Sequence, residues 1–186
     1  MKTYTVTSKD LDKNNNYIGK LDVANLDGNL EIEESLGIVT FRSLNVLGYI
    51  FAKAGCGIEA GCGIIAGSGI EADYEIKAGS GIEAGCGIEA GYGIKAGSGI
   101  EAGYGINCKL ELKFNYRLFA GISIYQNEEI AIKDIICGKL VGPGKVCYGN
   151  VKELGLPSDE KKSPCNMSEK VVKVEIDGVK YEAIIK

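Results

Sequence analysis

The chain has 186 residues, 45% of them hydrophobic, which is enough for one domain with a core, and a formal net charge of −4. It contains no histidine, which excludes serine–histidine–aspartate and cysteine–histidine catalysis, histidine-ligated metal sites and most proton shuttles at neutral pH. The acidic balance argues against direct binding of nucleic acid, and no apolar run approaches the length of a membrane span.

Residues 1–53 are predicted to form an N-terminal cap and irregular first coils. Leu21–Val23, Leu30–Ile32 and Leu44–Val46 each carry apolar residues two positions apart, as in a strand with one buried face. Glycines 28, 37 and 48 mark turns between them. Irregular first coils are expected because the terminal repeats of a solenoid must shield an open edge.

Residues 54–107 form nine six-residue units without a gap, of which AGSGIE is typical, and isoleucine recurs every six residues from Ile58 to Ile106. In each Ile-x-Ala the isoleucine and alanine face one side of a strand, and the middle residue, mostly charged, faces the other. The Gly-x-Gly between strands is expected to supply backbone freedom for a corner. An α-helix is excluded because each glycine would cost it roughly 1 kcal/mol.

A shift of eighteen residues superimposes 74–85 on 92–103 with eleven of twelve identities. Three units per coil predict a triangular prism of three coils for this stretch, with either handedness possible. Two outward rows are acidic and one is mixed, and residues 54–107 carry seven acids and two lysines, a net charge of −5. The predicted rows are Ile65, Glu83 and Glu101; Glu71, Glu89 and Asn107; and Glu59, Lys77 and Lys95.

The remaining chain divides into predicted C-terminal coils (108–156), a polar linker (157–169) and a β-hairpin (170–186). The hairpin has an Asp177-Gly178 two-residue turn, which places Ile176 opposite Val179 and Val174 opposite Tyr181. The predicted fold is therefore all-β: a triangular parallel β-helix of hexapeptide repeats, 18 residues per coil, with a C-terminal antiparallel β-hairpin. A hairpin is marginal alone, so it should dock on this chain or on a second copy, and a homodimer is expected.

The seven cysteines are expected to be reduced thiols, because their number is odd and residues 1–6 lack the apolar core of a signal peptide. Cys56, Cys62 and Cys86 take a small-residue position of the repeat. The other four, which are widely spaced, favour buried thiols over a four-cysteine zinc site; they are Cys108, Cys137, Cys147 and Cys165. No cofactor is predicted.

Two carboxylate pairs, Glu83 with Glu101 and Glu71 with Glu89, should stack one coil apart. A glycosidase-like pair is conceivable, but flat, solvated faces without a cleft are expected, so solvated charge is favoured. Tyr92 and Tyr104 replace the smaller residues of a corner, and Tyr74 should stack on Tyr92. Their rings are expected to project outward, either as anchors for a partner or packed under the C-terminal segment.

The IxAGxGIxAG repeat runs into RLFAGISIY (117–125) and CGKLVGPGKVCYG (137–149). In this combination the chain, over residues 44–156, resembles a family of uncharacterised bacterial and prophage-associated proteins. The resemblance implies a β-helix in a mobile-element setting. The repeat alone also resembles hexapeptide acyltransferases, whose histidine base is missing here, and the polymer-forming bactofilins.

The expected function is a non-enzymatic acidic binding protein, encoded by a phage or mobile element. It would occupy the basic, nucleic-acid-binding surface of a host defence protein such as a CRISPR effector, as an anti-CRISPR inhibitor does, in the cytoplasm of a bacterial host cell. The alternative is a self-assembling, bactofilin-like structural protein, and an enzyme comes third. The candidate partner-binding residues are Glu71, Glu83, Glu89, Glu101, Tyr92 and Tyr104.

Overall fold

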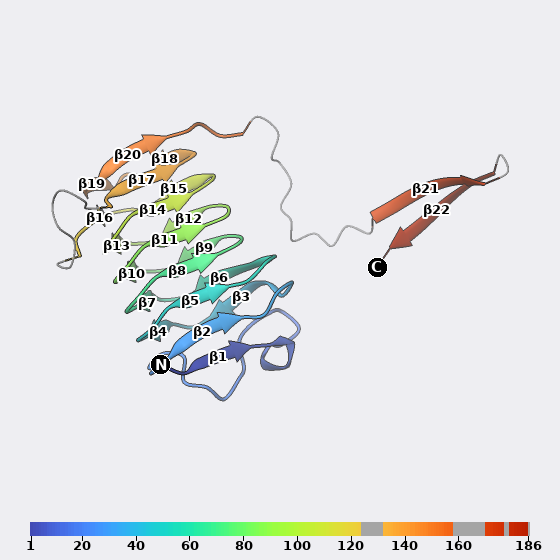
Figure 1. The fold of residues 1–186 in the computed structure, drawn as a ribbon, viewed down its shortest axis with the longest axis horizontal. Helices are drawn as coiled ribbons and strands as arrows, with labels where there is room; N and C mark the ends of the chain where they lie inside the picture. The colour runs from blue at the N-terminus through green and yellow to red at the C-terminus, as the bar shows by residue number, and fades with distance from the viewer. Residues whose placement is uncertain (124–131, 158–169, 177–178, 186) are drawn as a thin grey trace.

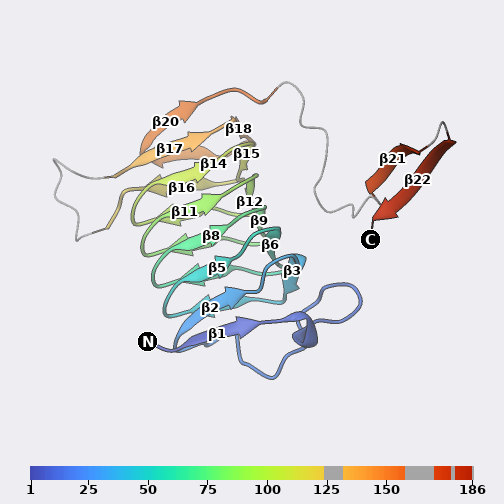
Figure 2. The same ribbon diagram turned by 45° about the vertical axis from the view of Figure 1, so that its right-hand side comes forward.

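The protein is a parallel β-solenoid in the computed structural model, which describes residues 1–123, 132–157, 170–176 and 179–185. About six coils of roughly 18 residues stack with their strands in three sheets, as Figures 1 and 2 show. The predicted parallel β-helix with three units per coil is therefore confirmed, and the coils continue on both sides of the regular repeat.

The three sheets are here called sheets I, II and III, in the order in which the chain visits them in each coil. Sheet I consists of β1 (Thr3–Val6), β2 (Asn29–Ile32), β5 (Ile50–Ala52), β8 (Ile70–Ala72), β11 (Ile88–Ala90), β14 (Ile106–Cys108), β17 (Asp134–Cys137) and β20 (Asn150–Glu153). Sheet II consists of β3 (Gly37–Phe41), β6 (Cys56–Ala60), β9 (Ile76–Ala78), β12 (Ile94–Ala96), β15 (Glu111–Lys113) and β18 (Lys139–Val141). Sheet III consists of β4 (Leu44–Val46), β7 (Ile64–Ala66), β10 (Ile82–Ala84), β13 (Ile100–Ala102), β16 (Arg117–Ala120) and β19 (Lys145–Tyr148).

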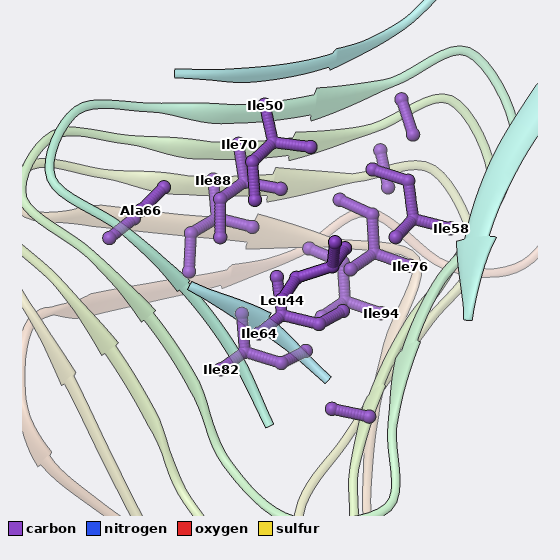
Figure 3. Close-up of a cluster of buried hydrophobic side chains, with 14 of the residues drawn as sticks. Leu44, Ile50, Ile58, Ile64, Ala66, Ile70, Ile76, Ile82, Ile88 and Ile94 are labelled. Carbon is purple, nitrogen blue, oxygen red and sulfur yellow. The ribbon is translucent and has the colours of Figure 1, made fainter. Parts of the chain in front are cut away.

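Isoleucine and alanine fill the interior, one stack of each per sheet. In Figure 3, Ile50, Ile70 and Ile88 form the isoleucine stack of sheet I, and the stacks of the other two sheets converge on it. These side chains are almost completely buried, and no polar or charged residue is buried among the residues whose exposure is described. The register pairs each outward residue with its predicted neighbour one coil away, such as Glu83 with Glu101, so all three predicted rows are confirmed.

The corner glycines are required for close stacking of the coils, not for the backbone freedom expected from the sequence. None of the glycines from 57 to 105 has a positive φ angle. A Cβ at Gly79, the first glycine of its corner, would instead overlap the carbonyl oxygen of Gly61 in the preceding coil. A Cβ at Gly81, the second glycine, would lie 3.4 Å from the Gly99 carbonyl oxygen, which is ordinary contact. The first glycine is thus the one that the coil spacing demands at this corner, and the same close approach recurs at Gly67, Gly85, Gly91, Gly97 and Gly103, although not at Gly61.

The N-terminal segment closes one end of the solenoid. It contains β1, a short 3₁₀ helix (Ser8–Asp10) and loops that pack Leu11 and Tyr17 against the core. The expected strand at Leu21–Val23 is absent: the Val23 amide donates to the Leu21 carbonyl and the Asp22 carboxylate accepts from the Ala24 amide, so the chain turns there. Side-chain capping by aspartate favours a turn over an extended strand at this point.

In the C-terminal part of the chain, β21 (Lys170–Ile176) and β22 (Val179–Ile185) pair with each other antiparallel, with Ile176 opposite Val179. The predicted Asp177-Gly178 turn and most of the predicted linker lie outside the described residues. Among the described residues no helix is long and apolar enough to cross a membrane.

Candidate functional site

The four predicted glutamates lie on the outer faces of two sheets. Glu71 and Glu89 are neighbours on β8 and β11 of sheet I, and Glu83 and Glu101 are neighbours on β10 and β13 of sheet III. All four are exposed. They lie there because each is the middle residue of an Ile-x-Ala strand whose flanking residues are buried.

The outer face of sheet I is not flat, contrary to the expectation from the sequence. A shallow groove of about 810 Å³ runs along it, with Glu71 and Glu89 on its floor. Side chains at the corner between sheets III and I form part of its lining, since Tyr49, Tyr104 and Ile132 all contribute to it. Of these three residues, Tyr104 takes the corner position that Ser68 and Cys86 occupy in the two preceding coils.

Sheet III carries a smaller groove of about 430 Å³. Glu83 and Glu101 line it together with Ile65, Arg117 and Phe119. The candidate glutamates are therefore divided between two grooves on different faces, and a single small ligand cannot contact all four.

The two faces share a pattern in which a pair of glutamates lies between apolar residues of adjoining coils. On sheet III, Ile65 precedes Glu83 and Phe119 follows Glu101 in the register. On sheet I, Phe51 precedes Glu71. Beyond Glu89, the same row continues through Asn107, whose side chain donates to the Glu89 carboxylate at 3.3 Å, to Ile136.

Sequence analysis placed Ile65 in the row of Glu83 and Glu101, but it missed the other three apolar residues, Phe51, Phe119 and Ile136. Phe119 lies eighteen residues after Glu101, so extending the repeat frame past Asn107 would have found it. Phe51 and Ile136 lie twenty residues before Glu71 and twenty-nine after Asn107, respectively. At both places the chain between matching strands is longer than eighteen residues, which displaces the repeat. No signal in the sequence gives the size of that displacement.

Other carboxylates on the sides of the solenoid are neutralised by lysines. Glu31 contacts the Lys53 ammonium at 2.8 Å and accepts from the Tyr49 hydroxyl, and these two hydrogen bonds hold the pKa of Glu31 below its usual value. The carboxylate of Asp134, whose pKa is likewise lowered, pairs with Lys152 and accepts from Asn150. Beside sheet II, two carboxylates meet a lysine row: Glu75 contacts Lys77 at 3.1 Å and Lys95 at 3.0 Å, and Glu59 lies 3.9 Å from Lys77.

Among the described residues, by contrast, no salt bridge involves any of the four candidate glutamates. At these four positions sheets I and III therefore carry carboxylates without a salt-bridge partner in the described part of the chain, although Arg117 lines the groove of Glu83 and Glu101. Glu59 and Glu75, beside sheet II, are paired with lysines. The glutamates of the regular repeat on sheets I and III thus differ from Glu59 and Glu75 beside sheet II in having no lysine partner within the described ranges.

The tyrosines divide between two corners. Tyr104 is half-buried and lines the sheet I groove beside Glu89. Tyr92 is also half-buried but lies at the corner between sheets I and II, outside both grooves, where its ring centroid is 4.6 Å from that of Tyr74. The predicted Tyr74–Tyr92 stack is confirmed, but Tyr74 is itself buried, because the neighbouring coil covers it. The structure thus brings Tyr104, and not Tyr92, together with candidate glutamates.

The cysteines do not gather into a metal site in the part of the chain that the structure describes. Cys108 and Cys137 are buried in successive coils of sheet I, and burial raises the pKa of Cys108 to about 12. Cys147 is exposed, which corrects the expectation that it is buried, because the last coil has no described coil above it. Cys165 lies outside the described residues.

Cys56 does not behave as the repeat predicts. It belongs to β6 and is buried, and its thiol donates to the Glu33 carbonyl at 2.9 Å while accepting from the Leu36 amide. The other two cysteines of the repeat, Cys62 and Cys86, are exposed and half-buried corner residues. The Cys56 thiol thus joins the irregular turn after β2 to the first regular coil.

The carboxylate pairs have the stacking that a two-carboxylate mechanism needs but not the environment. A general acid at neutral pH is usually a carboxyl group whose pKa is raised by burial, and all four candidate glutamates are exposed. The observed exposure agrees with the solvated charge that the sequence favours over a glycosidase-like pair at these positions.

The structure shows a parallel β-solenoid with 18-residue coils, which is the fold implied by the resemblance to prophage-associated proteins. The family itself stays a prediction from residue patterns. No protein-family model, no curated protein and no solved structure matches this chain.

Proposed function

We propose that this protein is a rigid, non-enzymatic binding scaffold whose two acidic faces engage a basic protein surface. The observation that carries the proposal is a contrast within the regular repeat: the four candidate glutamates of sheets I and III have no salt bridge among the described residues, whereas Glu59 and Glu75 beside sheet II are paired with lysines. A solenoid selected for solubility alone has no reason to pair the glutamates beside sheet II and not these four.

The grooves define the chemistry of the partner. Exposed charges add little affinity one by one, but a regular acidic ladder steers a basic partner and raises its association rate. Affinity must come from apolar burial, and Phe51 and Tyr104 in one groove and Phe119 in the other offer it. The proposed partner surface therefore carries lysine or arginine beside apolar side chains.

A basic protein surface of this kind commonly binds nucleic acid. We therefore propose competition with nucleic acid as the mode of action. Inhibition of a host defence protein such as a CRISPR effector is its most specific form, which rests on the resemblance to prophage-associated proteins.

The experiment uses the full-length protein as bait in a bacterial lysate, followed by mass spectrometry of the captured proteins. Two double variants, Glu71→Lys with Glu89→Lys and Glu83→Lys with Glu101→Lys, test the faces separately. The matched control is Glu33→Lys with Glu34→Lys, which makes the same change of charge at two exposed residues of a turn outside both grooves.

We expect the wild-type and control proteins to capture a basic nucleic-acid-binding protein, and at least one of the two face variants to lose it. Added nucleic acid should displace the captured protein. Equal capture by all three variants would overturn the proposal. A captured protein that nucleic acid does not displace would refute competition while leaving the binding faces intact.

A self-assembling structural protein is the second candidate. End-to-end stacking into a filament needs two open ends, and the N-terminal segment closes one of them with a strand and two bridges. This closure weighs against a filament and in favour of a discrete binding particle.

A further inference from the structure

The two ends of the solenoid are finished differently. At the N-terminal end, β1 is the outermost strand of sheet I and covers β2, the bridge of Asn16 with Thr40 covers β3 of sheet II, and the bridge of Leu26 with Val46 covers β4 of sheet III. The interior is sealed as well, because the Tyr17 ring packs 5.3 Å from that of Phe41.

At the C-terminal end, no described residue pairs with the outer edges of β18, β19 and β20. Val151 occupies the inward position above Ile135, yet it is 40% exposed, whereas Ile135 is fully buried. Leu140 and Val146, the inward residues of the other two sheets in this coil, are only partly buried. Unpaired edges over an exposed core are a template for further pairing and favour aggregation unless something covers them.

We propose that the chain's own C-terminal segment, residues 157–186, covers this open end by docking the β21–β22 pair on it. The chain leaves the solenoid at this same end, after β20. The N-terminal seal uses the 28 residues before β2, and 30 residues follow Leu156, so a comparable length of chain is available.

Three features favour the chain's own C-terminal segment over a second copy of the protein as the cover of this end. A tethered segment has an effective concentration near the millimolar range for a short flexible connection, and residues 157–169, fully extended, would span about 45 Å. Alternate positions of β21 and β22 predict one face with four charged residues, Lys173, Glu175, Lys180 and Glu182, and one predominantly apolar face made of Val172, Val174, Ile176, Val179, Tyr181, Ala183 and Ile185. A two-stranded hairpin is marginally stable by itself. Docking therefore stabilises the hairpin and also covers the open end of the solenoid.

Hydrogen exchange of the intact, full-length protein tests the proposal. The amides of β18–β20 should be protected like those of the inner coils, at the same level in dilute and concentrated samples. Rapid exchange of these amides at every concentration would show a bare end. Protection that rises with concentration would assign the end to a second copy, and either result would overturn the proposal.

A matched pair of variants identifies the covering segment. Val151→Asp places a charge at the open end, and Ile65→Asp places one at an equally exposed residue, also 40%, on the side of the solenoid. Val151→Asp should speed exchange in β21 and β22 at least about tenfold, because it releases the hairpin, while Ile65→Asp leaves it unchanged. Exchange in β21 and β22 that does not respond to Val151→Asp would refute docking at this end.

Discussion

Glu71 and Glu89 lie directly opposite each other on neighbouring parallel strands of sheet I, on the floor of one groove, and neither forms a salt bridge among the described residues. Like charges opposite each other in a sheet are destabilising. The repeat places the same arrangement on sheet III, at Glu83 and Glu101. The cost of these pairs is easiest to explain if the charge is used in binding.

Reversing Glu71 and Glu89 to lysine should slow association with the captured partner at least about tenfold at low salt, the lower end of electrostatic steering. Surface plasmon resonance at two salt concentrations measures this, and the difference between wild type and variant should shrink as salt screens the field. The turn variant Glu33→Lys with Glu34→Lys serves as the control. Equal slowing by both variants would mean that net charge alone, and not this groove, sets the rate.

Adjacent isoleucines in β7 give a stringent test of the interior. Ile64 is fully buried and Ile65 is 40% exposed. Ile64→Asp buries an unpaired charge and should unfold the protein at room temperature, since the cost of several kcal/mol is comparable to the total stability of a domain. Ile65→Asp should retain the wild-type melting temperature within a few degrees. Similar melting temperatures for the two variants would contradict the register of the stack.

The two glycines of one corner should respond differently to alanine. Gly79→Ala forces a Cβ onto the Gly61 carbonyl and is expected to cost about 1–3 kcal/mol. Gly81→Ala makes only ordinary contact and should be tolerated. Chemical denaturation of both variants measures the difference, and equal costs would indicate that backbone freedom, as first expected, is what the corner requires.

The buried thiol of Cys108 should make stability depend on pH in alkaline solution. Burial, with a smaller effect of Cys137, raises its pKa to about 12 in the folded protein, while an unfolded cysteine ionises near pH 8.5–9. The buried, protonated thiol therefore contributes fully to the free energy of unfolding below about pH 8.5. This contribution is lost as the pH rises towards 12, by about 1.4 kcal/mol for each pH unit.

Cys108→Ala removes this dependence and is the natural comparison, because alanine takes the equivalent position at Ala90. Denaturation under reducing conditions from pH 7 to 11 should show a shallower loss of stability in the variant. Tyrosine and lysine titrate in the same range, so the difference between the two proteins is the informative quantity. Parallel curves would mean that the thiol ionises as easily in the folded state as in the unfolded chain.

Much of the architecture follows from the sequence alone. The six-residue period and the eighteen-residue self-match determine the strand positions, the three sheets and the outward rows, because one unit such as IEAGSG repeats its local preference in every coil. The four glutamates could be placed on two acidic faces for the same reason. In a solenoid each coil contacts only its neighbours, so local patterns carry the fold.

The tertiary structure decided what the repeat cannot encode. The grooves depend on Phe51, Tyr104 and Ile132, which come from coils or corners of irregular length, and the sequence does not state how far such a corner displaces the frame. The ion pairs of Glu59 and Glu75 beside sheet II, and their absence from the four candidate glutamates among the described residues, depend on distances between side chains of different coils. The closed N-terminal and open C-terminal ends were likewise decided by non-local pairing, which no local period can specify.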